Sequence, residues 1–295
     1  MDIKVVAASH KEYRMPEDEI YLPLLVGAAL GNCVSDKAAD LYLRDDDGVN
    51  ISDKNKTYCE LTALYYAWKN LDADYLGLVH YRRHFEDPSA VKRKQKIKSA
   101  ANAGKAEKAY ARSETAGAGC DSSANAGLWD KILSGETLKE LLSDGTELIL
   151  PKKRNYLIET IYSHYAHSHH ENDLYVTRAV LKRKYPDYLP AWDQLMKGRT
   201  AHMFNMCIMR RDLLDAYCSW LFDVLKEVEA ELDMSSYTDF DKRVFGRISE
   251  LLMDVWVSRN NIKYKELPVL HMEGENWLLK GGKFIRRKFI RENPV

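Results

Sequence analysis

The sequence lacks three features: a long apolar run, an excess of charge of one sign, and paired cysteines. Lysine plus arginine and aspartate plus glutamate each number 44 in 295 residues, so no net field would attract nucleic acid, and no nucleic-acid-binding motif is found. No segment approaches the roughly 20 apolar residues of a membrane-spanning helix. The first residues, MDIKVVAAS, lack the basic start and long apolar stretch of a signal peptide. We therefore expect a cytoplasmic protein that does not bind nucleic acid.

The five cysteines are poorly placed for disulfide or metal chemistry. Their number is odd, and no two of them have a spacing such as Cys-x-x-Cys. Disulfide frameworks and zinc knuckles need paired cysteines, so neither is expected. The pattern predicts reduced thiols in a cytosolic setting, at Cys33, Cys59, Cys120, Cys207 and Cys218.

The sequence does contain an alternation of strand-like and helix-like segments. Short apolar runs predict strands at 3–9, 75–80, 147–151, 203–209 and 262–270. Amphipathic patterns predict helices at 57–71, 212–232 and 247–259. Thr57 and Glu60 have the spacing of a capping box near the start of the first of these helices. The alternation is typical of an α/β fold with a mostly parallel central sheet flanked by helices.

The stretch 90–127 interrupts this order. It is rich in alanine, glycine, serine and lysine and has almost no large apolar side chain to bury. We interpret it as a basic surface insertion. Two roles are open: a solvated excursion without a specific task, or a lid or acceptor clamp that orders on binding.

The segment DYLGLVHYRRHF, residues 74–85, joins an apolar strand to a group of cationic and aromatic side chains. Ligands of open α/β sheets collect at the carboxyl ends of strands, where this group is expected to lie. Period-2 alternation predicts His80 with Arg82 on one side and Tyr81 with Arg83 on the other. Guanidinium groups suit a diphosphate. The alternative is that each arginine pairs with a structural carboxylate such as Glu60 or Glu86.

Five segments carry a family resemblance. They are DGVNISDKNKTYCELTALYYAWKN with DYLGLVHYRRHF, LILPKKRNYLIETIYSHY, FNMCIMRRDLLDAYCSWLF and RVFGRISELLMDVW. Together they resemble bacterial proteins catalogued as a domain of unknown function, number 4422, which sit among capsule and exopolysaccharide glycosyltransferases. The resemblance extends from about residue 3 to residue 270. It implies a GT-A-like domain over 1–277, followed by a basic tail at 278–295.

The resemblance also implies an activity. A GT-A-like enzyme would move a hexosyl or galactofuranosyl group from a nucleotide-diphosphate donor, expected to be a UDP-sugar, to a growing capsular or exopolysaccharide glycan. Two other classes stay open, because fold analogy does not establish chemistry. One is a noncatalytic module that binds nucleotide sugars or glycans, and the other is an enzyme that transfers a sugar phosphate during polysaccharide assembly.

Charge stabilisation of the leaving diphosphate is the central requirement of sugar transfer. Many GT-A enzymes meet it with a divalent cation held by an Asp-x-Asp motif at the end of a central strand. Here HYRR occupies that place, so we expect Arg82 and Arg83, helped by His80 or Tyr81, to replace the metal. No metal is favoured. The reserve ligands for Mn or Mg are Asp45 and Asp47, which precede the helix at 57–71, and His271 in a C-terminal segment similar to one that binds metal in some GT-A enzymes.

Other side chains are assigned by the resemblance and by their polarity. Glu250 is the expected general base, near the start of a helix, with Asp254 one turn later on the same face. His170, Asp173 and Asp254 are assigned to the acceptor side. The candidate donor-binding residues are Ser9, His10, Lys11, Asn50, Ser52, Lys54, Asn55, Glu60, Tyr81 and Asn205.

The segment LLKGGKFIRRKFIREN near the C-terminus combines six cations with four apolar side chains. As a helix, residues 280–291 would present a small apolar stripe on a basic surface. Such a helix could lie on an anionic inner leaflet, which suits an enzyme with a lipid-linked glycan acceptor. The alternative is that the same stripe docks on the body of the domain.

Overall fold

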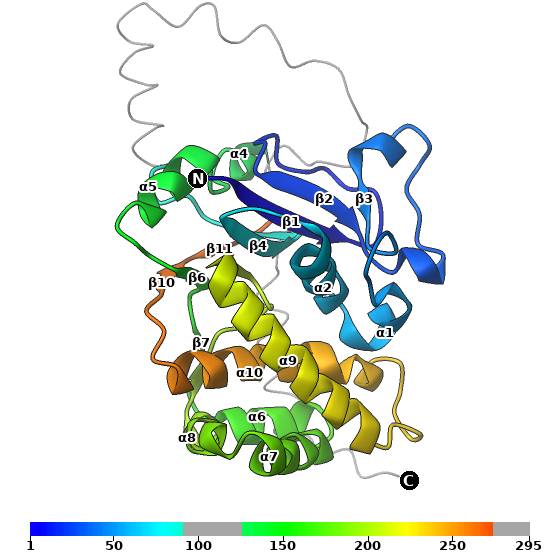
Figure 1. Cartoon of the computed structure of the whole chain (residues 1–295), viewed down its shortest axis with the longest axis vertical. Helices are drawn as coiled ribbons and strands as arrows, with labels where there is room; N and C mark the ends of the chain where they lie inside the picture. The colour runs from blue at the N-terminus through cyan, green and yellow to red at the C-terminus, as the bar shows by residue number, and fades with distance from the viewer. Residues whose placement is uncertain (91–125, 274–295) are drawn as a thin grey trace, which may run out of the picture.

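The computed structural model describes residues 1–90 and 126–273. Within these residues, nine strands form one mixed sheet, in which β10-β6-β9-β4-β1-β2-β3 are consecutive neighbours (Figure 1). All of these run parallel except β9, which is antiparallel to β4 and β6. The bounds are β1 Ile3–Ser9, β2 Tyr21–Leu25, β3 Leu43–Arg44, β4 Tyr75–His80, β5 Arg83–Phe85, β6 Leu148–Pro151, β9 Cys207–Arg210, β10 Lys265–Leu267 and β11 Val269–His271. The expected α/β fold with a mostly parallel sheet is confirmed.

Both faces of this sheet are buried, which explains the unbroken apolar runs of its strands. In β1, Val6 packs with one cluster of apolar side chains and Val5 with another, because neighbouring side chains point to opposite faces. Gly77 in β4 is required by close packing. A Cβ atom at this position would lie 2.9 Å from a side-chain carbon of Ile208 and 3.0 Å from the carbonyl oxygen of Cys207.

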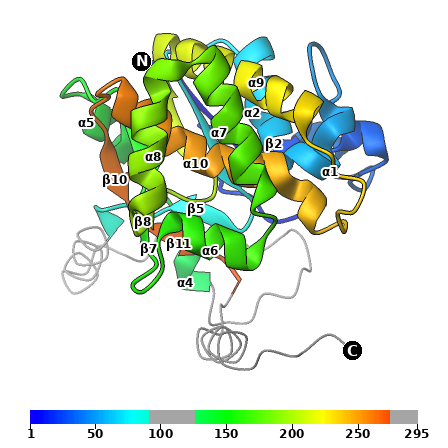
Figure 2. The same cartoon turned by 90° about the horizontal axis from the view of Figure 1, so that it is seen from below.

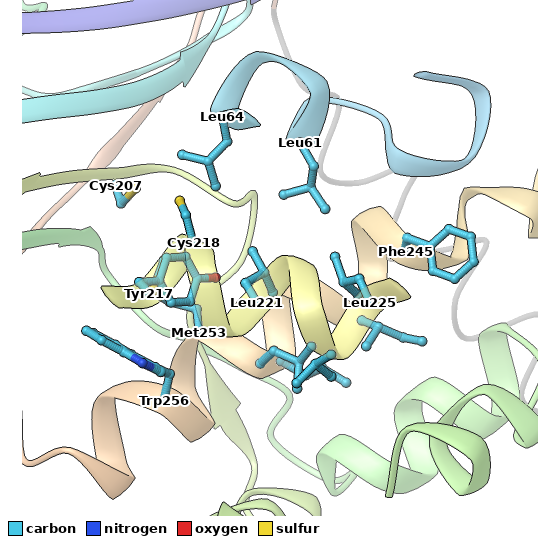
Figure 3. Close-up of a cluster of buried hydrophobic side chains, with 14 of the residues drawn as sticks. Leu61, Leu64, Cys207, Tyr217, Cys218, Leu221, Leu225, Phe245, Met253 and Trp256 are labelled. Atoms are coloured by element: carbon cyan, nitrogen blue, oxygen red, sulfur yellow. The ribbon is translucent and has the colours of Figure 1, made fainter. Parts of the chain in front are cut away.

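Helices α2, α9 and α10 cover one face, and Figure 3 shows their side chains meeting below β9. Leu61 and Leu64 come from α2, Leu221 from α9 and Trp256 from α10. A further layer of helices packs on α10 (Figure 2). The helices are α1 Asn55–Tyr58, α2 Leu61–Asn70, α4 Ala126–Trp129, α5 Gly135–Leu142, α6 Ile161–Ser168, α7 Asn172–Lys184, α8 Leu189–Lys197, α9 Arg211–Glu231 and α10 Val244–Arg259.

The helix predicted at 57–71 is in fact two helices, and the predicted capping box is wrong. Cys59 has a φ of 52°, a left-handed conformation that ends α1 before α2 begins. Thr57 therefore lies inside α1, where its hydroxyl donates to the carbonyl oxygen of Lys54. Glu60 precedes α2 without capping it through its side chain, so it is left available for longer-range contacts.

Two predicted strands also differ from the structure. The strand predicted at 203–209 begins only at Cys207, because Phe204 and Asn205 adopt left-handed conformations. The strand predicted at 262–270 is divided into β10, which pairs with β6, and β11, which pairs with β5. Pro268 lies between them and has no N–H to donate to a sheet. The strands predicted at 3–9, 75–80 and 147–151 and the helices predicted at 212–232 and 247–259 are confirmed to within three residues.

The insertion predicted at 90–127 lies almost entirely outside the described residues, and the tail predicted at 278–295 lies wholly outside them. The lid and clamp roles of the first and the membrane helix at 280–291 of the second stay predictions. In the part of the chain that is described, no helix has the length and apolar character needed to cross a membrane.

Candidate functional site

The carboxyl ends of β1 and β4 and the amino end of β9 lie at one edge of the sheet. Because β9 is antiparallel to β4, its entry residues Phe204 and Asn205 come next to His80, the last residue of β4. Glu60 reaches the same edge from the break between α1 and α2. We call His80, Glu60, Phe204, Asn205 and Glu250 the strand-end cluster.

His80 is held by the backbone of the β9 entry. Its Nε2 lies 2.6 Å from the carbonyl oxygen of Phe204 and 3.9 Å from Glu60 Oε1. Burial, opposed by the charge of Glu60, lowers the pKa of His80, which keeps the ring neutral at pH 7. The neutral ring then donates from Nε2 to the carbonyl, and this bond fixes its orientation.

Asn205 connects three parts of the chain. Its Nδ2 donates to Glu60 Oε1 at 2.7 Å and to the carbonyl oxygen of Gly246 at 2.8 Å. Ser249 donates to Asn205 Oδ1 at 2.8 Å. Phe204 and Asn205 have φ values of 79° and 53°, and such consecutive left-handed residues are costly unless the surroundings enforce them. The strained entry of β9 thus positions Glu60 against His80.

Glu250 projects from α10 to the same entry, where its Oε1 accepts a hydrogen bond from the Phe204 backbone N–H at 2.8 Å. Burial and the neighbouring Glu60 carboxylate raise the pKa of Glu250 to about 8. At neutral pH the Glu250 carboxyl is therefore largely protonated. A carboxyl whose pKa lies near the working pH is suited to acid–base chemistry.

The arginines after β4 do not alternate as predicted, because β4 ends at His80 and a turn at 81–82 leads into β5. Arg83 places its guanidinium 4.6 Å from the centre of the Phe204 ring, inside the strand-end cluster. Arg82 lies over the Tyr81 ring and forms an ion pair with Glu273 at 2.9 Å. Arg82 therefore does pair with a carboxylate, as the alternative predicts, although its partner is Glu273 and not Glu60 or Glu86.

Two further arginines at this edge were not predicted from the sequence. Arg243 donates from Nε to Cys59 Sγ at 3.2 Å, and the neighbouring thiol and carboxylates raise its pKa. Arg247 lies one helical turn later and helps to offset the rise in the pKa of Glu250. The segment RVFGRISE could have indicated both arginines. Arg243 and Arg247 are four residues apart and Arg247 and Glu250 three apart, and such spacings put side chains on one helix face.

The loop after β1 brings its predicted residues to the same edge. The His10 ring contacts the Tyr81 ring edge-on with centroids 5.3 Å apart, and Lys11 lies 5.7 Å from the centre of that ring. Burial, with Lys11 and Arg82 nearby, lowers the pKa of His10. Ser9 is buried and its hydroxyl bonds to the backbone of Lys11, which shapes the loop.

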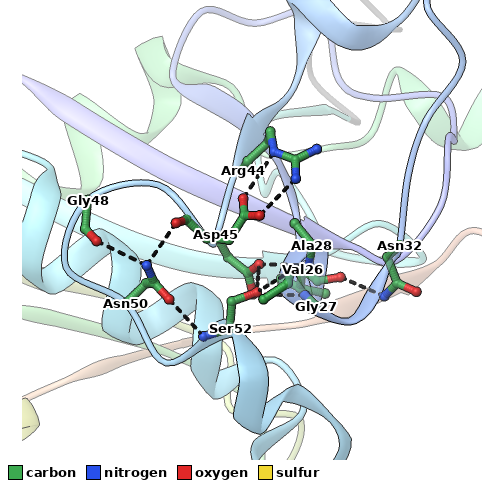
Figure 4. A network of polar contacts seen from close by, with 11 residues as sticks. Val26, Gly27, Ala28, Asn32, Arg44, Asp45, Gly48, Asn50 and Ser52 are labelled. Carbon is green, nitrogen blue, oxygen red and sulfur yellow. Dashed lines mark hydrogen bonds and ion pairs between the residues drawn. The ribbon is translucent and has the colours of Figure 1, made fainter.

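The other predicted donor-binding residues are occupied by structural contacts, and Figure 4 shows those of Asn50 and Ser52. Asn50 donates to the carbonyl oxygens of Asp46 and Gly48 and accepts from Ser52 N–H, so it forms a turn. Lys54 pairs with Glu229 at 2.6 Å, and Asn55 donates to Thr62 and to the Cys59 carbonyl oxygen.

Asp45 is fully buried and its carboxylate accepts four hydrogen bonds (Figure 4). The donors are the N–H groups of Gly27 and Ala28, at 2.9 and 3.1 Å, and the hydroxyls of Ser52 and Thr62, at 2.5 and 2.7 Å. These bonds use the lone pairs that a metal ion would need. The Asp-x-Asp at Asp45 and Asp47 thus does not fit the metal site of a GT-A enzyme.

His271, the third reserve metal ligand, does reach the strand-end cluster. The antiparallel pairing of β11 with β5 places it opposite Arg83, and its ring meets the Phe204 ring edge-on with centroids 5.8 Å apart. In residues 1–90 and 126–273, however, no group of three His, Cys, Asp or Glu side chains has an arrangement that could hold a metal ion.

Of the residues predicted for the acceptor side, His170 and Asp173 both contact Tyr237, whereas Asp254 contacts His202 instead. His170 stacks on Tyr237 with ring centroids 4.0 Å apart, and buried Asp173 accepts from Tyr165 and Tyr237. Asp254 accepts from the buried His202 at 2.7 Å. It lies one turn after Glu250 on the same face of α10, as predicted. The neighbouring His164 and His167 share the Glu159 carboxylate.

Comparisons with known proteins are consistent with this geometry. The sequence model of a family described as "Domain of unknown function (DUF4422)" matches residues 4–261. The apo structure of the WbbM bifunctional glycosyltransferase is similar to the chain with a TM-score of 0.74 and 28% sequence identity, over 93% of this chain and 46% of that one. The chain thus spans about half the length of that enzyme. No curated protein matches the sequence.

Proposed function

The chain belongs to the DUF4422 family, and from this membership and the strand-end cluster we propose that it transfers a sugar from a nucleotide-diphosphate donor to a glycan acceptor. The observation that carries the proposal is the convergence of His80, Glu60, Asn205, Glu250 and Arg83 at the edge where α/β sheets bind ligands. The likeness to a bifunctional glycosyltransferase at 28% identity supports it.

In this proposal, cations stabilise the departing diphosphate. Arg83 and the neutral His80 lie at the end of β4, and Arg82, Lys11 and Arg243 surround them. Negative charge develops on the diphosphate as the bond to the sugar breaks, so cations fixed in advance lower the barrier. No step is assigned to a metal at Asp45, because four hydrogen bonds occupy that carboxylate.

In this scheme the ionised form of Glu250, which is the minor form at neutral pH, takes the proton of the acceptor hydroxyl. A general base works best when its pKa is close to the working pH, and burial brings the pKa of Glu250 to about 8. Asn205 holds the neighbouring Glu60 in place, so Glu60 supplies the charge that keeps the proton affinity of Glu250 high. In this pair Glu250 is the base, and Glu60 is the neighbouring charge that raises the pKa of the base.

The finer assignments follow the family resemblance. We propose a UDP-sugar donor, a hexosyl or galactofuranosyl group, and a capsular or exopolysaccharide acceptor carried on a lipid at the inner face of the plasma membrane. A panel of nucleotide sugars tests this, scanned first by thermal shift and then by release of nucleoside diphosphate with and without acceptor glycan.

The outcomes of that panel separate the function classes. Acceptor-dependent release of nucleoside diphosphate supports the transferase. Stabilisation by a donor without turnover, with any acceptor, would identify a binding module instead. Transfer of a sugar phosphate with release of the nucleoside monophosphate would identify the third class.

A further inference from the structure

The loop after β7, Arg154–Asn155, exposes two adjacent large apolar side chains. Leu157 is 72% exposed and Ile158 is 64% exposed. Apolar surface gathered at one point marks interaction sites more often than single exposed side chains do. Figure 2 shows this loop beside β8, Thr200–Ala201, at the edge of the outer helical layer.

Hydrogen bonds fix the loop in the conformation that displays these side chains. Leu157 has a φ of 56°, and its N–H donates to Asn155 Oδ1 at 2.8 Å. Arg199 donates from Nη1 to the Leu157 carbonyl oxygen at 3.0 Å, and its own carbonyl oxygen accepts from Tyr156 N–H at 2.9 Å. The apolar tip is therefore held outward before any partner arrives, which lowers the cost of binding.

Cations surround this tip. Lys152, Lys153 and Arg154 precede it in the chain, the Arg199 carbonyl oxygen accepts from Tyr156 N–H, and Lys197 lies two residues before Arg199 at the end of α8. All five residues are exposed, although the Lys153 side chain is only 34% exposed and lies 3.4 Å from Asp254.

The carboxylates on these elements are engaged elsewhere. Glu159 accepts from His164 and His167, and Asp193 holds Arg178 through two hydrogen bonds. The basic character around the tip is thus not cancelled by the acidic side chains of the same loop and helix. We call residues 152–158 with Lys197 and Arg199 the basic apolar loop.

We propose that the basic apolar loop docks this protein on an anionic phospholipid bilayer, with Leu157 and Ile158 inserted at the acyl boundary and the five cations on the lipid phosphates. An exposed apolar tip within a group of lysines and arginines matches the two layers of such a surface. An acidic protein surface would satisfy the cations and leave the two apolar side chains in contact with polar groups.

The loop is connected to the strand-end cluster. The Tyr156 hydroxyl donates to Met203 Sδ at 3.5 Å, and Met203 directly precedes Phe204. A bilayer on this loop would therefore lie beside the edge of the sheet that holds His80 and Glu250. The inference concerns binding alone, so it does not depend on the proposed function.

Co-sedimentation of the full chain with vesicles tests the inference. The vesicles are phosphatidylcholine alone and phosphatidylcholine mixed with phosphatidylglycerol. We expect binding to the second kind only, and about tenfold weaker partitioning for the double variant Leu157→Ser, Ile158→Ser. The matched control is Leu41→Ser, Val49→Ser, whose side chains are 68% and 56% exposed on another part of the molecule.

A second pair of variants tests the charges. Lys152→Ala with Lys197→Ala should weaken binding and flatten its salt dependence, whereas Lys37→Ala with Lys263→Ala, which removes the same charge from other exposed positions, should not. The thermal unfolding midpoint of each variant reports whether its fold is intact. Equal recovery of loop and control variants with anionic vesicles, all folded, would overturn the inference, as would wild-type protein that stays in the supernatant.

Discussion

Two carboxylate sites at the sheet, one buried and one partly exposed, differ in how many hydrogen bonds their oxygens accept. Asp45 accepts four hydrogen bonds from Gly27, Ala28, Ser52 and Thr62. Glu250 has one bond from a backbone N–H and a second carboxylate, Glu60, as its neighbour, and its pKa rises to about 8. A carboxylate that accepts four hydrogen bonds holds parts of the fold together. A carboxyl group with one donor and a charged neighbour can instead take up and release a proton. The first site is structural, and the second is where we place the chemistry.

The largest effect is expected for Asp45→Ala. The substitution leaves two N–H groups and two hydroxyls buried without their acceptor, which should cost about 3 kcal/mol or more of unfolding free energy. Urea unfolding measures the loss. Asp47→Ala is the control and should change little. An Asp45→Ala protein as stable as the wild type would remove the distinction between the two sites.

Arg82→Ala and Arg83→Ala should each lower turnover by about 10²-fold while the fold survives, since each removes a cation from the leaving diphosphate. The measurement is the rate of nucleoside diphosphate release. Arg210→Ala, which removes an exposed arginine from the far end of β9, serves as the control. Under the same scheme a chelator leaves most activity intact. Complete loss that manganese restores would contradict it and return attention to His271.

The pH dependence of stability, compared between the wild type and Glu250→Gln, tests the raised pKa of Glu250. The pKa of Glu250 is raised in the folded protein, so the native state keeps a proton that the unfolded chain loses above its ordinary value of 4.5. Wild-type stability should therefore fall relative to the variant as pH rises from about 4.5 to about 8. Thermal unfolding of both proteins across this range measures it. A constant difference between their midpoints would show that the carboxyl titrates normally.

Deletion of 280–295 is expected to change vesicle binding alone and to leave stability and catalysis in solution unchanged. The six cations of this tail should add to vesicle binding, each contributing about 1 kcal/mol near an anionic surface, less at higher salt. Co-sedimentation of truncated and full-length protein measures the change, and donor hydrolysis in solution should be the same for both. Identical partitioning at low salt would exclude a membrane role for the tail.

Apart from Phe204, the strand-end residues could be named from the sequence one by one. His80 follows an apolar run, Glu250 stands in a helical pattern, and Asn205 precedes a short strand. Their mutual contacts could not be named, because Asn205 and Glu60 are 145 positions apart and meet only through the pairing of β9 with β4. The left-handed Cys59 could not be foreseen either, since nothing in a helical pattern marks a single residue with positive φ.

The sequence by itself determined the class of fold and the kinds of side chain at the site. Apolar periodicity reports local burial, so β1, β4, α9 and α10 follow from it. The tertiary structure alone decided that the Asp45 carboxylate accepts four hydrogen bonds and that the Glu250 carboxyl accepts one. The reason is physical: the proton affinity of a buried carboxyl depends on the number of donors and charges around it, and these come from distant segments, Gly27 and Thr62 in one case and Phe204 and Glu60 in the other.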